Sequence, residues 1–150
     1  MKKNKKGFTL VELLAVIVIL GVLLMIAVPA IQNVIANSQK RSFNSAAKLA
    51  IENVETIASA QKIDGGLFSA GKTSCYIELS AIELERGSYG EGYGGYVSVN
   101  EKGKGTIYYY NNSFYLNGGT IDDADATLQG DTKTTFSIPT GTTTERCSWY

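Results

Sequence analysis

Two cysteines and one isolated glutamate are the side chains with the most distinctive chemistry in this sequence of 150 residues. Cys75 and Cys147 lie far apart, so the chain has no CxxC motif for redox or metal chemistry. Glu12 is the only charged residue within a long apolar stretch. The chain contains no histidine, which excludes the catalytic triads and zinc sites that need an imidazole. Because the other acids are scattered and no nucleophile motif accompanies them, we expect neither enzymatic activity nor a cofactor.

The apolar stretch around Glu12 runs from Phe8 to Ile31 and has the length of a transmembrane helix. As an α-helix it would span roughly 36 Å, enough to cross a bilayer. Four of the first six residues are lysine, which predicts a cytoplasmic amino terminus and an external carboxyl side. A removable signal peptide, with its small-residue site at 28–30, and an ordinary signal anchor are the alternatives. Neither explains a carboxylate inside the apolar stretch.

Residues 5–14, with the sequence KKGFTLVELL, resemble the amino terminus of type IV prepilins. They include the glycine before the cleavage site, the phenylalanine after it and the glutamate four residues later, and the similarity extends to about Pro29. The resemblance implies that a membrane aspartyl protease, prepilin peptidase, cuts between Gly7 and Phe8. The same enzyme would then methylate the new amino group of Phe8.

The resemblance also implies an α+β pilin fold, in which a long amino-terminal helix packs on a small antiparallel β-sheet. The leader would be residues 1–7, the hydrophobic transmembrane and assembly helix residues 8–31, and the extracellular globular domain residues 32–150. Apolar residues between 31 and 62 recur at three- and four-residue steps, which predicts that the helix continues in amphipathic form. Alternation and turn residues then predict strands at 96–99, 106–110 and 113–116, a hairpin loop at Asn111-Asn112, and an edge strand near 134–138.

In the resembled family, Glu12 would pair with the Phe8 amine of a neighbouring subunit. The two residues are four apart and so share one face of the helix. Pairing would neutralise a charge that is costly in lipid and turn it into an assembly signal. Gly21 and Pro29 match positions that bracket a stretch which often melts on assembly. A simple kink at the proline is an equal alternative.

We expect a disulfide between Cys75 and Cys147. Disulfides persist outside the cytoplasm, and two cysteines allow one intramolecular pairing. The pair also resembles the disulfide that closes the carboxy-terminal loop of pilins. Two buried free thiols are the alternative.

The resemblance implies a structural subunit of a type IV pilus, polymerised into an extracellular helical fibre for adhesion, twitching motility or DNA uptake. A pseudopilin of a type II secretion or competence system, or a minor pilin, is the alternative. The implied partners are other pilin subunits, prepilin peptidase, the pilus assembly machinery and, before assembly, membrane lipid. The precursor would reside in the inner or cytoplasmic membrane with one span. With zero net charge and no basic patch beside the aromatic residues, we identify no nucleic-acid site.

A calcium loop near the carboxyl end is what resemblance to major secretion pseudopilins would add. Candidate oxygen ligands are present, but their spacing is not that of an EF-hand, and an acidic loop is more often simply solvated. We therefore expect no metal site. The oxygen ligands that a calcium loop would draw on are those of Asp122, Asp123, Asp125 and Asp131.

Overall fold

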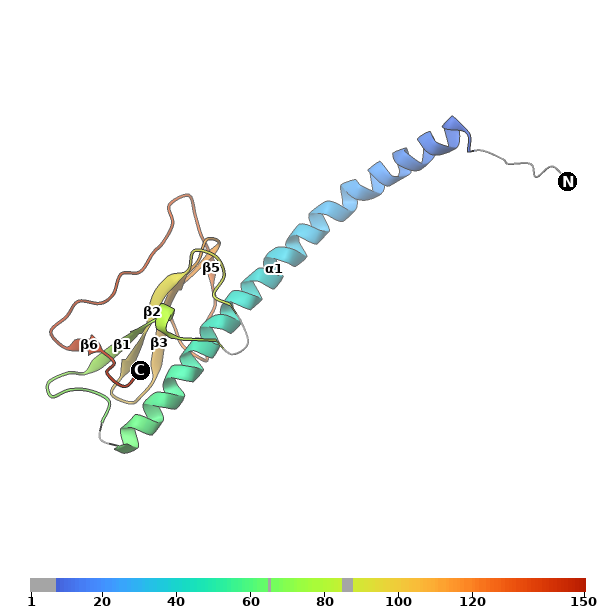
Figure 1. The fold of residues 1–150 in the computed structure, drawn as a ribbon. Coiled ribbons are helices and arrows are strands. Elements are labelled where there is room, and N and C mark those ends of the chain that lie inside the picture. The colour runs from blue at the N-terminus through green and yellow to red at the C-terminus, as the bar shows by residue number, and fades with distance from the viewer. Residues whose placement is uncertain (1–7, 65, 85–87) are drawn as a thin grey trace. The chain divides into compact units, whose positions relative to one another are not determined.

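The computed structural model describes residues 8–64, 66–84 and 88–150, and Figure 1 shows its elements in chain order. The chain divides into two compact units, one ending at Gln39 and one running from Lys40 to Tyr150. The predicted leader, including Gly7, lies outside the described residues. Every contact discussed below lies within one of the two units.

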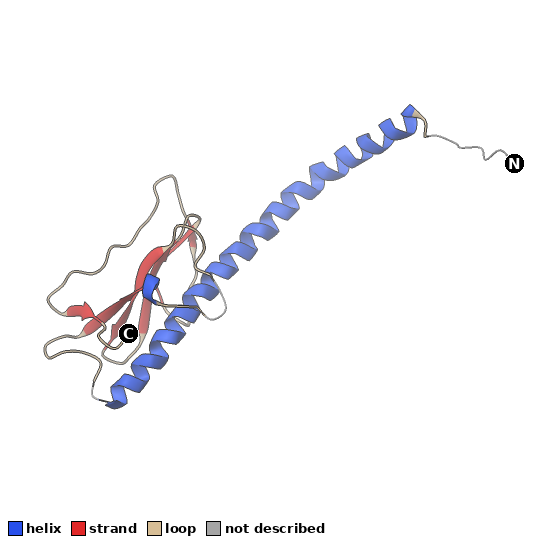
Figure 2. Ribbon diagram, in the orientation of Figure 1, coloured by secondary structure: helices blue, strands red, loops and turns tan. Residues whose placement is uncertain are grey.

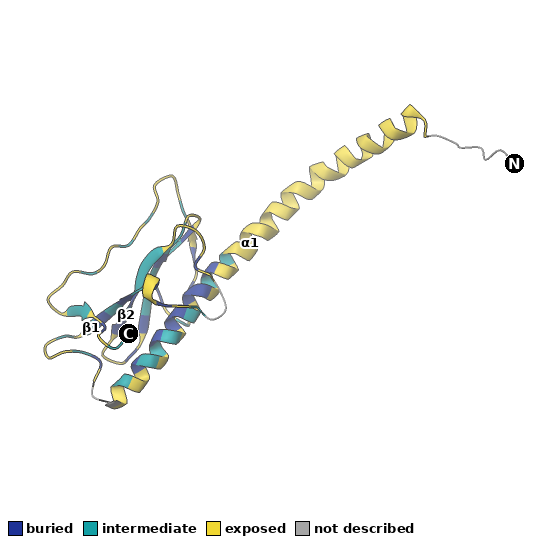
Figure 3. Cartoon of the chain, in the orientation of Figure 1, coloured by how far each residue is buried: buried dark blue, intermediate teal, exposed yellow. Residues whose placement is uncertain are grey.

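Helix α1 spans Leu10–Asp64 and contains 55 residues, which confirms the predicted long helix to within two residues at each end. From Lys40 onward, one face of α1 is buried and carries many alanines, so the helix can approach the sheet closely (Figure 3). The apolar periodicity predicted between residues 31 and 62 is confirmed as a buried face in its second half. Its first members, Ile31, Val34 and Ile35, are exposed. The buried residues of this face are Phe43, Ala46, Ala47, Ala50, Ile51, Val54 and Ala58.

The second unit also contains one six-stranded sheet, with strand order β5-β4-β3-β2-β1-β6. Figure 2 shows its strands in red beside the helix and the connecting loops. Neighbouring strands are antiparallel except for β1 and β6, which are parallel. A short 3-10 helix, η1, follows β1 directly. The bounds are β1 Ser74–Glu78, η1 Leu79–Ala81, β2 Gly94–Asn100, β3 Gly105–Tyr110, β4 Phe114–Gly119, β5 Thr127–Leu128 and β6 Thr144–Arg146.

The expected edge strand near 134–138 is wrong, because those residues form no strand. The two edges of the sheet are occupied instead by β5 and β6. Phe136 turns its ring onto Tyr108 and Tyr110, at centroid distances of 5.8 and 6.3 Å. The segment therefore packs through one side chain on the sheet face rather than through its backbone on a sheet edge.

The β3–β4 hairpin also differs from its prediction in mechanism. We expected asparagine to adopt a positive φ in the turn, but no described residue other than glycine has one. Instead, the Oδ1 atom of Asn111 accepts hydrogen bonds from the backbone N–H groups of Ser113 and Phe114, at 2.9 and 2.8 Å. The side chain thus replaces a backbone carbonyl as the acceptor in this turn.

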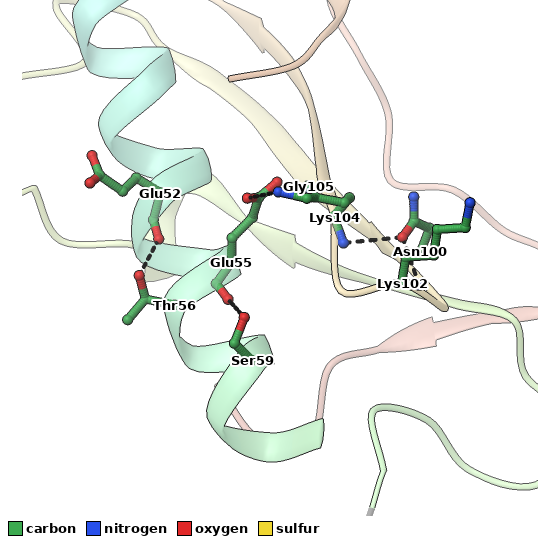
Figure 4. A network of polar contacts seen from close by, with 8 residues as sticks. All are labelled: Glu52, Glu55, Thr56, Ser59, Asn100, Lys102, Lys104 and Gly105. Atoms are coloured by element: carbon green, nitrogen blue, oxygen red, sulfur yellow. Dashed lines mark hydrogen bonds and ion pairs between the residues drawn. The ribbon is translucent and has the colours of Figure 1, made fainter. Parts of the chain in front are cut away.

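Glu55 fastens the sheet to α1 through the turn between β2 and β3 (Figure 4). Its Oε1 atom accepts a hydrogen bond from the Gly105 N–H at 2.9 Å, and its Oε2 atom pairs with Lys104 Nζ at 3.0 Å. Asn100 Oδ1 stabilises the same turn by accepting hydrogen bonds from the N–H groups of Lys102 and Lys104. A charged acceptor therefore fixes where the buried face of the helix meets the first residue of β3.

Candidate functional site

The first turn of α1 is built around Thr9 and Glu12. Glu12 Oε2 accepts hydrogen bonds from the Thr9 N–H at 2.8 Å and from the Thr9 hydroxyl at 2.9 Å. The Thr9 hydroxyl in turn accepts a bond from the Glu12 N–H at 3.3 Å. This reciprocal arrangement is a capping box, which satisfies donors that a helix start leaves free. The sequence pattern for a capping box is present here: a threonine is followed three residues later by a glutamate, before an apolar run.

The capping box holds the Glu12 carboxylate at the start of the helix, next to Phe8. The carboxylate binds the backbone N–H of Thr9, and Phe8 is the residue directly before it. While residue 7 precedes it, the nitrogen of Phe8 is an uncharged peptide nitrogen. Cleavage there would create an ammonium group on Phe8, one residue before the Thr9 N–H that the carboxylate binds. The Phe8 side chain is 92% exposed and precedes the first helical residue, so the ring is accessible.

The apolar residues that follow are exposed along α1 as far as Ile35 (Figure 3). This part of the helix is long and apolar enough to cross a membrane. None of its most apolar stretch is buried by other residues of the chain. An uninterrupted apolar surface of this size on an isolated chain indicates that lipid or other protein covers it.

Both helix-melting candidates, Gly21 and Pro29, are helical in this structure. Apart from the adjoining residues of its own helix, nothing lies within 4 Å of the position that a Cβ on Gly21 would occupy. Pro29 lies inside the helix, where it cannot donate a backbone hydrogen bond. The two residues are weak points in an otherwise regular apolar helix, and their behaviour on assembly stays a prediction.

The predicted disulfide between Cys75 and Cys147 is present, with the two Cα atoms 5.0 Å apart and both side chains buried. It lies beside the parallel pairing of β1 and β6, and the Cys147 N–H donates to the Tyr76 carbonyl at 3.0 Å. The last two residues are held as well. Trp149 Nε1 donates to the Leu67 carbonyl at 3.0 Å, and the Tyr150 hydroxyl donates to Asn53 Oδ1 at 3.2 Å.

Of the four calcium candidates, Asp125 has protein partners. It forms an ion pair with Lys40 Nζ at 2.8 Å and accepts a hydrogen bond from Asn44 Nδ2 at 3.3 Å. The bond from Lys40, and then that from Asn44, hold the pKa of the Asp125 carboxyl below its usual value. Among the described residues, no group of three acidic, cysteine or histidine side chains gathers as metal ligands would.

The three consecutive tyrosines of β3 alternate between the two faces of the sheet. Tyr109 points into the core and stacks on Phe43, with ring centroids 3.9 Å apart and planes 6° apart. Burial raises the pKa of Tyr109, and its hydroxyl donates to the Tyr89 carbonyl. Tyr108 lies on the other face and stacks on Tyr96 at 4.9 Å. These tyrosines therefore take part in ordinary side-chain packing on the two faces of the sheet.

Known proteins share sequence with this chain, most of all at its amino-terminal end. Residues 2–28 match the family described as the prokaryotic N-terminal methylation motif. A fimbrial protein of Moraxella nonliquefaciens is 36% identical over 87 residues, which cover 58% of this chain and 52% of that protein. The type IV major fimbrial protein FimA of Dichelobacter nodosus is 56% identical over 39 residues, or 26% of this chain and 25% of its own. The type IV major alpha-pilin of Moraxella bovis is 38% identical over 81 residues, or 54% and 45%.

The chain thus spans about half the length, or less, of these curated relatives. No solved structure gives a significant match. The matched residues contain Phe8, Glu12, Gly21 and the start of the exposed apolar helix, the same features that the geometry brings out. The chain is therefore related to the type IV fimbrial proteins and carries the amino-terminal methylation motif of prokaryotic prepilins.

Proposed function

We propose that this chain is a structural subunit of a type IV pilus, made as a membrane-anchored precursor and polymerised into an extracellular helical fibre. The observation that carries the proposal is an exposed apolar helix whose first turn holds a single carboxylate and whose start lies within the matched methylation motif. Such a helix suits lipid before assembly and a bundle of like helices after it. Fibres of this kind serve adhesion, twitching motility or DNA uptake.

Processing would begin at the cytoplasmic face of the inner or cytoplasmic membrane, where the lysine-rich leader stays. Prepilin peptidase would cut between Gly7 and Phe8 and methylate the amine of Phe8. The methylated amine keeps its positive charge. The span would leave the second unit outside the cytoplasm, where its disulfide persists. The assembly machinery in the membrane would then extract the mature subunit into the fibre.

Assembly would use Glu12 as the partner of the Phe8 amine on a neighbouring subunit. Within one chain, the Oε2 atom of Glu12 already accepts two hydrogen bonds from Thr9. A neighbour's ammonium group would neutralise the carboxylate as the helices leave the lipid, where an unpaired charge is costly. Apolar contact alone would let neighbouring helices shift along each other, and the pairing would fix their relative axial position.

A pseudopilin or a minor pilin would share the same amino terminus. The relatives favour the pilus subunit, because two of them are named as a type IV major fimbrial protein and a type IV major alpha-pilin. Immunogold labelling of sheared surface filaments tests the choice. A pilus subunit would be labelled along the whole filament, and a strain without prepilin peptidase would show neither filaments nor label. Label confined to filament tips, or to the cell membrane in a piliated strain, would contradict the proposal.

A further inference from the structure

A groove of about 500 Å³ runs along α1 in the second unit, on a side that the sheet does not cover. Leu49 and Ile57 of α1 and Leu84 of the segment after η1 form its apolar part, and all three are half-buried. Asn53 closes it toward the carboxyl end of the chain, since its Oδ1 atom holds the hydroxyl of Tyr150.

Two carboxylates, those of Glu52 and Glu83, line the groove and are exposed. Figure 4 shows Glu52 pointing away from the Glu55 and Lys104 pair. Within residues 8–64, 66–84 and 88–150, neither Glu52 nor Glu83 forms an ion pair. An apolar trough with unpaired acids at its rim is complementary to an apolar helix that carries a basic residue.

Residues 31–41 of α1 have this chemistry. Ile31, Val34 and Ile35 are exposed to 55%, 67% and 50%, although they interrupt a polar sequence. Arg41 is also exposed, and it follows Val34 by seven residues, which is about two turns or 10 Å along a helix. The groove has a similar length on α1, from Leu49 to Ile57. Residues 31–41 and the groove residues Leu49–Ile57 are successive segments of helix α1, so we look to a second copy of the chain for the occupant.

We propose that the groove receives residues 31–41 of a second copy of the chain, with apolar contact along its floor and Arg41 of that copy facing Glu52 and Glu83. The inference rests on the proposed fibre and names one of its subunit contacts. In a fibre whose helices all run in the same direction, residues 31–41 of one subunit would lie beside the groove of a subunit that is displaced toward the base of the fibre. Apolar contact would supply the attraction, and the charges would set the register.

Charge reversal tests the contact. Glu83→Arg and Arg41→Glu should each lower the mass of sheared filaments about tenfold, because like charges then face each other at every repeat. The double variant, which restores opposite charges in swapped order, should recover filaments to near the unchanged level. Glu101→Arg, an exposed acid in the turn between β2 and β3, is the matched control and should not change the yield.

Photocross-linking locates the contact directly. A benzoylphenylalanine placed at Thr56, an exposed residue of the groove, should on irradiation of intact filaments link to a peptide containing residues 31–41 of another copy. Filaments made from a mixture of ¹⁴N and ¹⁵N subunits show whether the link joins two copies. If filaments form but the link falls elsewhere, or the double variant recovers nothing, the inference is wrong and the fibre stands. If the unchanged chain forms no filaments, the proposed function itself fails.

Discussion

The carboxylate of Glu12 accepts hydrogen bonds from both the backbone and the hydroxyl of Thr9, so a substitution there changes the helix start as well as the charge. Glutamine can keep the capping box, because its side-chain oxygen accepts the same bonds. Leucine keeps neither the bonds nor the charge. The position therefore allows the two roles of the carboxylate to be separated experimentally.

We predict that Glu12→Gln and Glu12→Leu both leave a stable, membrane-inserted protein and both abolish fibre formation. Each variant removes the charge that would compensate the Phe8 amine, while insertion becomes easier. Thr9→Val is the matched control, since it removes the hydroxyl of the cap but keeps the carboxylate, and it should still form fibres. Electron microscopy of cells that express each variant as their only pilin provides the measurement. Normal fibre numbers from Glu12→Gln would mean that the cap, and not the charge, is what assembly needs.

The Lys40–Asp125 pair gives the second unit a dependence on pH whose sign follows from geometry. Because Lys40 and Asn44 bind the carboxylate, the pKa of Asp125 is lower in the folded protein than in the unfolded chain. The stabilisation is therefore fully present above the unfolded value of about 4 and is lost as the pH falls through the folded value. We predict that Asp125→Asn lowers the denaturant midpoint at pH 7.

The fluorescence of Trp149, the only tryptophan, reports this transition for the full chain in detergent. In a second measurement at low pH, the midpoints of the unchanged protein and Asp125→Asn should converge as the Asp125 carboxyl becomes protonated. Asp131→Asn, which changes an exposed acid in the following loop, should have little effect at either pH. A difference for Asp125→Asn that persists undiminished at low pH would show that the ion pair is not its cause.

At the scale of elements, β2 and β3 approach each other closely at one glycine. Gly95 has a φ of +123°, and a Cβ there would lie 1.9 Å from the Tyr108 carbonyl oxygen. We predict that Gly95→Ala destabilises the second unit by at least about 2 kcal/mol, because both the backbone conformation and the space favour glycine. Gly130→Ala is the control, since nothing lies within 4 Å of its added methyl group. Equal unfolding midpoints for the two variants would contradict this account of the β2–β3 pairing.

The elements that the sequence predicted well are those whose pattern is local. The long helix and the strands β2, β3 and β4 follow from apolar periodicity, and the helix–sheet arrangement agrees with the α+β expectation. Strands β5 and β6 have two and three residues, so no periodicity could reveal them. Their pairing depends on distant contacts: β6 lies next to Cys147, which is bonded to Cys75 in β1. Phe136 was misassigned for the related reason that its partners, Tyr108 and Tyr110, lie far away in sequence.

The residues of the candidate sites also differ in whether the sequence alone could reveal them. Glu12 and the cysteine pair were evident from residue type and location alone. The groove along α1 was not, because it needs Leu84 to lie beside Leu49 and Ile57, and only tertiary packing brings these together. The exposure of Ile31, Val34 and Ile35 was also missed, since a helical stripe looks the same in sequence whether its partner is the chain's own sheet or another molecule.

At the scale of the whole molecule, the disulfide joins positions 72 residues apart and holds the carboxyl-terminal tail against the second unit. The tail also depends on Glu145, whose Oε1 atom accepts the Ser69 N–H at 2.7 Å, and on the Trp149 bond to Leu67. We predict that reduction destabilises this unit by about 4 kcal/mol in the chain-entropy model. Backbone exchange should then rise first in β6 and the tail, and last in the buried face of α1.

Hydrogen exchange by mass spectrometry, on filaments with and without reductant, measures this order. The Cys75→Ala/Cys147→Ala double variant serves as the control for side effects of the reductant and should reproduce the same pattern. If α1 lost its protection together with β6, the disulfide would stabilise the whole unit rather than its distal part.

The central claim is that a cut at one bond converts a membrane precursor into a fibre subunit whose first residue is a methylated amine. Intact mass spectrometry of subunits from sheared surface filaments, followed by fragmentation of the amino-terminal peptide, tests it most directly. The account predicts a chain of residues 8–150 that begins with N-methyl-Phe8 and lacks two hydrogens because of its disulfide. Filament subunits that still carried residues 1–7, or that began at any other residue, would contradict it.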